Sequence, residues 1–381
     1  MKFLWFNNSN EIIAYKFLRV PFGTASSPFL LYSAMYKAFQ LNQSLDLLKY
    51  FYVDDLLISG DCDKEVSEKI NKCSEILSLY GFNLSKFVSN YSSEIDPTPV
   101  KVLGYLWNPK EDILIIRMIK CVEYHTPRQL VSLIARFYDM FGFLAPILSE
   151  LKRIFSNSWK LSKLWDSPYD QMTLKNIERV IKQLPSSPVI KRNLSLKNST
   201  LLLFTDANSS TIGFSLYVYS NGESNLLFAK SRLKSCKTIP KAELEALILG
   251  CNFLMYISKF VKPSRIIIFC DSMITISRVK IDNINRLEHP IAMRCIRIRN
   301  ILNELNAELH HIDGRSNPAD HLTKFNNLSF EDWISPTFVI PDVPEVVKHV
   351  TETEQTISYN RANELISLIQ HAKHLNDIIP S

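Results

Sequence analysis

The sequence lacks the features that mark membrane and secreted proteins. No apolar run reaches the roughly 20 residues that a membrane-spanning helix needs, and the nearest, residues 246–257, contains Gly250, Cys251 and Asn252. Residues 3–6 are too few for a signal peptide and are followed by Asn-Asn-Ser-Asn. The seven cysteines form no Cys-x-x-Cys motif and accompany no His at zinc-finger spacing, so we expect reduced thiols in an intracellular protein.

The positive charge of the chain is unevenly distributed. The net charge is +6, and residues 110–192 alone contain 14 Lys or Arg against 8 Asp or Glu. A second basic cluster has no acid within it and consists of Lys230, Arg232, Lys234, Lys237 and Lys241. Such patches favour a polyanionic partner, although a solvated basic surface is an equally good explanation from charge alone.

Two adjacent acids, Asp54 and Asp55, lie in the motif Tyr-Val-Asp-Asp within the apolar segment 48–59. The flanking apolar and β-branched residues predict a β-hairpin with the two acids at its tip. Two like charges need either exposure to water or a cation. A divalent metal that also binds phosphate would supply that cation, as in two-metal phosphoryl transfer. A plain turn between two strands is the alternative.

The 381 residues suffice for two or three domains. The apolar pattern predicts an α+β order, β-β-loop-α-β-β-α-β-β, up to residue 108, with short strands or extended segments at residues 82–88 and 102–107. Residues 126–184 are predicted to be helical. From residue 201 onwards the order β-β-β-α-β-α-α-β-α predicts a mixed sheet flanked by helices, and residues 360–379 are predicted to form a terminal helix.

Four acids in the last region fall at related places. Asp206 and Asp271 end predicted strands, whereas Glu243 and Asp320 lie in the first turns of predicted helices. Strand ends and helix starts can meet at one edge of a sheet, so we expect the four carboxylates to converge. They would repel one another unless divalent metals neutralise them, and Mg²⁺ (or Mn²⁺) suits an all-oxygen site. Taken singly, each acid is also explained as a cap, a turn residue or a favourable charge at a helix N-terminus.

The segments around these acids resemble the four acidic motifs of ribonuclease H. They read Phe-Thr-Asp-Ala at 204–207, Lys-Ala-Glu-Leu at 241–244, Phe-Cys-Asp-Ser at 269–272 and Asn-Pro-Ala-Asp at 317–320. Together with the Tyr-Val-Asp-Asp motif, they make residues 1–330 resemble the polyprotein of Pao/BEL long-terminal-repeat retrotransposons. The resemblance implies that the four acids bind Mg²⁺ and hydrolyse the RNA strand of an RNA–DNA hybrid.

The same resemblance implies part of a reverse-transcriptase palm upstream. Asp54 and Asp55 match its catalytic, metal-binding pair. Phe22 and Gly23 match the loop that contacts template and incoming nucleotide, and Lys86 matches the lysine that protonates the leaving pyrophosphate.

Two further segments resemble the same elements: residues 103–107 the primer grip, and residues 126–146 the connection region. With Lys230 and Arg232 as phosphate contacts, the implied partners are RNA–DNA hybrid, template-primer and other parts of the polyprotein, without a membrane. The implied location is the cytoplasm (in a virus-like particle) or the nucleus.

A palm also needs a third carboxylate on a strand before Gly23. The acids before Asp54 are Glu11 and Asp46, and neither ends an apolar strand. In the family this acid precedes a stretch like residues 2–5, so the resemblance implies that the missing strand and the fingers lie upstream of Met1. We therefore expect the chain alone not to polymerise DNA at a useful rate.

The predicted organisation is a multidomain α+β and α/β fold. It comprises a partial palm (1–108), a basic thumb- or connection-like helical segment (109–195), a ribonuclease H-like domain (196–330), and a linker with a terminal helix (331–381). The predicted function is that of a reverse transcriptase/ribonuclease H fragment, an endonuclease with an incomplete polymerase site. The alternative is a catalytically inactive nucleic-acid-binding remnant or a domesticated protein.

Overall fold

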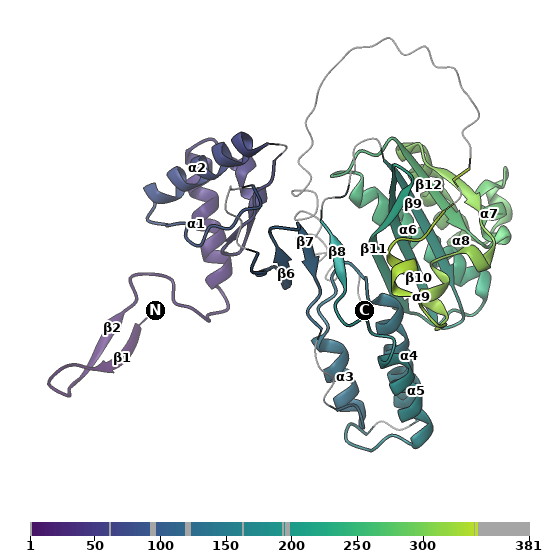
Figure 1. Ribbon diagram of the computed structural model, residues 1–381, viewed down its shortest axis with the longest axis horizontal. Coiled ribbons are helices and arrows are strands. Elements are labelled where there is room, and N and C mark those ends of the chain that lie inside the picture. The colour runs from purple at the N-terminus through teal and green to yellow at the C-terminus, as the bar shows by residue number, and fades with distance from the viewer. Residues whose placement is uncertain are drawn as a thin grey trace, which may run out of the picture. The chain divides into compact units, whose positions relative to one another are not determined.

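The computed structural model describes residues 2–341 except 61, 92–96, 119–122, 162–163, 193, 195–198 and 339. The chain divides into two compact units, one of Met1–Tyr91 with Ser358–Ser381 and one of Ser92–Ile357. Figure 1 shows the helices and strands of both units. The terminal helix predicted at residues 360–379 lies outside the described residues. Among the helices that are described, none combines the length and hydropathy needed to cross a bilayer.

The first unit is built around two helices. Helix α1 (Ser27–Leu41) and helix α2 (Asp63–Leu79) share a core that includes Phe39, Tyr50 and Leu77. The other elements are the antiparallel pair β1 (Lys2–Phe6) and β2 (Ile12–Lys16), the short helix η1 (Leu45–Tyr50), and the hairpin of β3 (Phe51–Tyr52) and β4 (Asp55–Leu56).

Residues 82–88, predicted as a short strand or an extended segment, form no strand and have no regular secondary structure. Phe82 and Leu84 pack against the core of the unit, which explains the alternating apolar pattern. Lys86, however, has φ +59, in the left-handed region that a strand does not adopt.

A four-stranded antiparallel sheet begins the second unit. Its strands follow one another in the order β5 (Val100–Val102), β6 (Tyr105–Asn108), β7 (Ile113–Ile115) and β8 (Val189–Lys191). The single strand predicted at residues 102–107 is therefore two strands, which turn at Leu103 and Gly104 with positive φ at both. The predicted helical region lies between β7 and β8 and forms α3 (Pro127–Arg136), α4 (Ala145–Leu161) and α5 (Gln171–Ile181).

A five-stranded mixed sheet forms the rest of the second unit, in the order β11-β10-β9-β12-β13. Its strands are β9 (Thr200–Ala207), β10 (Thr211–Ser220), β11 (Glu223–Leu233), β12 (Arg265–Cys270) and β13 (Glu308–His311). Strand β12 runs parallel to its neighbours β9 and β13, and its almost continuous apolar sequence matches its burial as an interior strand of the sheet.

Helices surround this sheet as the sequence predicts (Figure 1). They are α6 (Ile239–Ile257), α7 (Met273–Lys280), α8 (His289–Leu305) and α9 (Asp320–Thr323), followed by α10 (Phe330–Ile334). Helix α6 packs on β9 and β10, with α8 against it, while α4 packs on β11 and α9.

The helical segment and the five-stranded sheet are joined through a close backbone approach. The amide of Ala229 in β11 donates to the carbonyl of Phe141 at 2.8 Å, and a Cβ on Gly142 would lie 1.8 Å from the carbonyl oxygen of Ala229. The indole of Trp333, which is 1% exposed, donates to the carbonyl of Phe143 at 2.9 Å. The two segments share one compact unit, and their predicted division near residue 195 stays a prediction.

Candidate active site at the edge of the five-stranded sheet

The sheet brings Asp206 and Asp271 to the same edge. Strands β9 and β12 are parallel neighbours in which Thr205 is paired with Cys270, so the next residue of each chain segment is an aspartate. Glu243 lies on α6, which packs on β9 and β10. Asp320 is the first residue of α9, which also packs on β9 and β10. Four elements therefore deliver the four predicted acids to one region.

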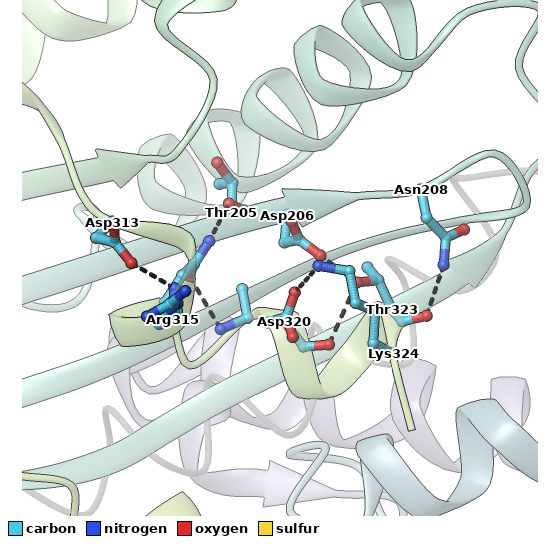
Figure 2. A network of polar contacts seen from close by, with 10 residues as sticks. Thr205, Asp206, Asn208, Asp313, Arg315, Asp320, Thr323 and Lys324 are labelled. Carbon is cyan, nitrogen blue, oxygen red and sulfur yellow. Dashed lines mark hydrogen bonds and ion pairs between the residues drawn. The ribbon is translucent and has the colours of Figure 1, made fainter. Parts of the chain in front are cut away.

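Two asparagines hold α9 against β9. The side-chain amide of Asn317, which is 3% exposed, donates to the carbonyl of Thr205 at 3.0 Å, while its oxygen accepts from the amide of Ala319. At the other end of the helix the side-chain amide of Asn208 donates to the carbonyl of Thr323 at 2.6 Å (Figure 2). A helix of four residues has little stability of its own, so these bonds position Asp320.

The acids share one electrostatic field. Asp206 is 2% exposed, and burial raises the pKa of its carboxyl group, with further upward contributions from Asp271 and Asp320. Glu243 is 6% exposed, and burial, followed by the charges of Asp206 and Asp271, raises its pKa to about 9. The neighbouring carboxylates therefore make ionisation of Asp206 and Glu243 harder, as like charges at one site do.

The donor set fits a divalent metal. Within the described residues, Oε2 of Glu243 and Oδ1 of Asp271 are buried without a hydrogen-bond partner. One ligand atom from each of Glu243, Asp271 and Cys270 lies within 4.8 Å of the others. Burial raises the pKa of the Cys270 thiol to about 12, so this thiol stays protonated and is a poor ligand. The remaining carboxylate oxygens are the ligands that Mg²⁺ and Mn²⁺ prefer.

The structure adds two residues that the motifs did not reveal. The hydroxyl of Thr323 donates to Oδ2 of Asp206, and the ammonium group of Lys324 pairs with Oδ1 of Asp320 (Figure 2). The four-residue spacing between Asp320 and Lys324 was a usable signal, because residues at i and i+4 meet on one side of a helix. Nothing in the sequence linked Thr323 to Asp206, which lies 117 residues away.

The predicted hairpin at Asp54 and Asp55 is confirmed. The two strands pair through Tyr52 and Asp55, and Val53 turns the chain with φ +55. Both acids are exposed, and partial burial followed by the charge of Asp54 raises the pKa of Asp55. Their role in metal binding stays a prediction.

The two other acids upstream have different neighbours. Glu11 accepts from the side-chain amide of Asn7 at 3.1 Å within the β1–β2 turn. Burial, followed by the charge of Asp46, raises the pKa of the Cys73 thiol on α2 to about 12, so Asp46 lies near α2. Neither observation makes Glu11 or Asp46 a third ligand beside Asp54.

The predicted nucleotide contacts of the first unit are solvent-accessible. Phe22 is fully exposed and precedes Gly23, whose φ of +78 turns the loop before α1. Lys86 is exposed as well. The contacts of these three residues with nucleic acid stay predictions.

Lys230 and Arg232 lie two residues apart on β11, where a third cation joins them. Burial lowers the pKa of Lys230, and the charges of Arg232 and of Lys152 on α4 lower it further. Lys152 belongs to the basic segment 110–192, but the sequence did not predict its position beside Lys230 because the two residues lie on different elements. The three residues, called here the β11 basic cluster, concentrate positive charge at the edge strand of the sheet.

Several solved structures are similar to this chain at low sequence identity. The foamy viral protease-reverse transcriptase in complex with RNA/DNA hybrid is 15% identical, with 89% of this chain and 42% of that chain covered and a TM-score of 0.45. LC11-RNase H1 in complex with RNA/DNA hybrid is 21% identical, with 32% and 92% covered and a TM-score of 0.26. RNase H1 from the halophilic archaeon Halobacterium salinarum is 15% identical, with 32% and 92% covered and a TM-score of 0.25.

The chain thus spans less than half the length of the foamy viral protein. A comparison with curated proteins found no match. Two protein families match consecutive parts of the sequence. Residues 1–106 match the reverse transcriptase (RNA-dependent DNA polymerase) family, and residues 126–272 match the Pao retrotransposon-like RNaseH-like domain. The second match includes Asp206, Glu243 and Asp271. The chain therefore carries a reverse-transcriptase segment followed by a Pao retrotransposon-like RNaseH-like domain.

Proposed function

We propose that this chain binds RNA–DNA hybrids and cleaves their RNA strand as a metal-dependent endonuclease. The observation that carries the proposal is the convergence of four acids, from β9, α6, the end of β12 and α9, on one edge of the sheet. Burying unpaired carboxylate oxygens is costly. The unpartnered oxygens of Glu243 and Asp271 therefore indicate a site built for cations rather than for a fold-stabilising hydrogen-bond network.

The four acids would hold Mg²⁺ or Mn²⁺, which supply activation of water and neutralisation of charge at the phosphodiester. Asp206 and Glu243 form the buried floor of the site, and Asp271 and Asp320 are its more accessible members. The Thr323 hydroxyl fixes the orientation of the Asp206 carboxylate. Fixed ligands cost little reorganisation when the substrate arrives.

The β11 basic cluster of Lys152, Lys230 and Arg232 would bind backbone phosphates of the hybrid. Such contacts make affinity fall as salt concentration rises. Charge alone does not separate RNA from DNA, so choice of the RNA strand requires contacts with 2′-hydroxyl groups.

The proposal does not extend to DNA synthesis by this chain. Asp54 and Asp55 are the polymerase pair by family, but among the described residues of the first unit Glu11 and Asp46 are the other acids that precede them, and each has a different neighbour. A pair of acids without a third ligand holds divalent metal weakly.

The decisive experiment is cleavage of a hybrid whose RNA strand carries an end label. The full chain in Mg²⁺ or Mn²⁺ should produce internal RNA cuts, and Asp206→Asn should reduce the rate by at least about a hundredfold because it alters the buried ligand. Glu304→Gln, an exposed acid on α8, is the matched control and should cleave normally.

Two outcomes would contradict the proposal. Hybrid binding without any cleavage by the unaltered chain would identify a non-catalytic remnant instead. Equal cleavage by the unaltered chain and Asp206→Asn would assign the activity to another site or to a contaminant.

A further inference from the structure

Lys324 places a positive charge inside the carboxylate cluster. Its ammonium group pairs with Oδ1 of Asp320, and Figure 2 shows it beside Asp206 as well. Asp206 and Asp271 are among the groups whose charge acts on Lys324. The charge of Lys324 in turn acts on Asp206 and Glu243, so it reaches all four acids of the site.

Carboxylates that converge on one site need a nearby positive charge when no metal is bound, and the ammonium group of Lys324 supplies one. Carboxylates gathered at one site repel one another when they are ionised, and this repulsion destabilises the fold unless a cation offsets it. A lysine ammonium carries one charge on a flexible four-carbon stem, so it offsets the repulsion only partly and can leave.

The backbone of Lys324 is held by hydrogen bonds, whereas its ammonium group can move. The amide of Lys324 donates to the carbonyl of Asp320 at 2.7 Å, and the amide of Asp320 donates to the carbonyl of Asn317 at 3.1 Å. The side chain of Lys324 is nevertheless 59% exposed, whereas that of Asp320 is 17% exposed. The ammonium group can therefore rotate into water without disturbing Asp320.

We infer that Lys324 is a placeholder cation, which occupies the carboxylate cluster in the metal-free protein and must leave it for a divalent metal to bind. This inference rests on the proposed metal-dependent function. It adds a residue that sets the metal concentration at which the site fills. Lys324 acts through Asp320 and is a positioning residue rather than a catalytic one.

Competition for the same oxygens has a clear consequence. Removing the ammonium group should lower the stability of the metal-free fold, because the acids lose their counter-ion. The same change should tighten metal binding, because the metal no longer displaces a cation. A lysine that merely stabilises α9 would give the first effect without the second.

The test follows the melting temperature of the full chain as Mn²⁺ is added. A ligand that binds only the native state raises this temperature by an amount set by its concentration and its dissociation constant. Lys324→Met should melt lower than the unaltered chain without metal and should bind Mn²⁺ roughly three- to tenfold more tightly, as expected for loss of one partly exposed competing charge. Lys324→Arg keeps the charge and should resemble the unaltered chain.

Lys182→Met is the matched control, because Lys182 forms an i,i+4 ion pair with Glu178 on α5. It should leave Mn²⁺ affinity unchanged. Unchanged or weaker Mn²⁺ binding by Lys324→Met, in a chain that otherwise binds Mn²⁺ through Asp271, would overturn the placeholder role and leave the proposed function intact. Absence of Mn²⁺ binding by the unaltered chain, or binding that Asp271→Asn does not affect, would defeat both.

Discussion

The two acidic sites of this chain carry their charge in opposite ways. Asp54 and Asp55 are neighbours in sequence and exposed at a hairpin tip, where water screens them. Asp206 and Glu243 are far apart in sequence and almost completely buried. Exposed like charges cost little and need no partner, whereas buried ones depend on a cation. The two acids that adjoin in one short motif therefore repel each other less than the buried acids, which come from separate elements.

The largest expected difference between the two sites is in activity. A single preparation of the full chain should cleave the RNA of a hybrid yet extend a primer on an RNA template at no more than about a hundredth of that rate, because the exposed pair holds metal weakly. Denaturing gel analysis of both reactions in the same Mg²⁺ buffer measures this. Primer extension at a rate similar to that of RNA cleavage would contradict this prediction and would show that Asp54 and Asp55 form an active polymerase site.

The next difference concerns pH and the stability of the metal-free chain. Burial raises the pKa of Glu243 from 4.5 to about 9, so the folded state binds a proton that the unfolded state releases. The stability that this proton provides is present at low pH and is lost as the pH rises from about 4.5 to 9.

Glu243→Gln should therefore become more stable than the unaltered chain as the pH rises, by on the order of 1–3 kcal/mol near pH 9, the cost of a buried unpaired charge after relaxation. Urea unfolding in EDTA at pH 5 and pH 9 measures it. Asp55→Asn, at the exposed site, should show little such change. A pH-independent difference for Glu243→Gln would mean that water or a cation already satisfies that carboxylate.

The smallest expected effect is the loss of stability when the hydrogen bond between Thr323 and Asp206 is removed. Thr323→Val removes the hydroxyl that donates to Asp206 and should cost about 1 kcal/mol of stability, the typical value for one hydrogen bond. Thr173→Val on α5, whose hydroxyl bonds the exposed Asp170, is the control and should cost less. Equal losses in the two variants would show that burial adds nothing to the Thr323 bond.

Local sequence predicted much of the fold because strong local patterns determined it. The apolar strand β12 follows from the β preference of its residues, and the hairpin at Asp54 from the apolar and β-branched residues on either side of it. The same reasoning failed at residues 82–88, where Phe82 and Leu84 alternate like a strand but pack on a helical core. It also read β5 and β6 as one strand, because a turn at Leu103 with φ +48 is not expected of leucine.

Short motifs were enough to predict the four acids, because each acid lies at the end of a strand or the start of a helix, and their catalytic role stays a prediction. The sequence also indicated a basic, nucleic-acid-binding chain, whose location inside the cell stays a prediction. The hydrogen bonds and positive charges around those acids follow from the packing of separate elements. The roles of Thr323 and Lys324 depend on the docking of α9 against β9, and the contribution of Lys152 depends on the packing of α4 against β11. The bond between Thr323 and Asp206 spans 117 residues, and Lys152 and Lys230 lie on separate elements, so no local pattern records these two contacts.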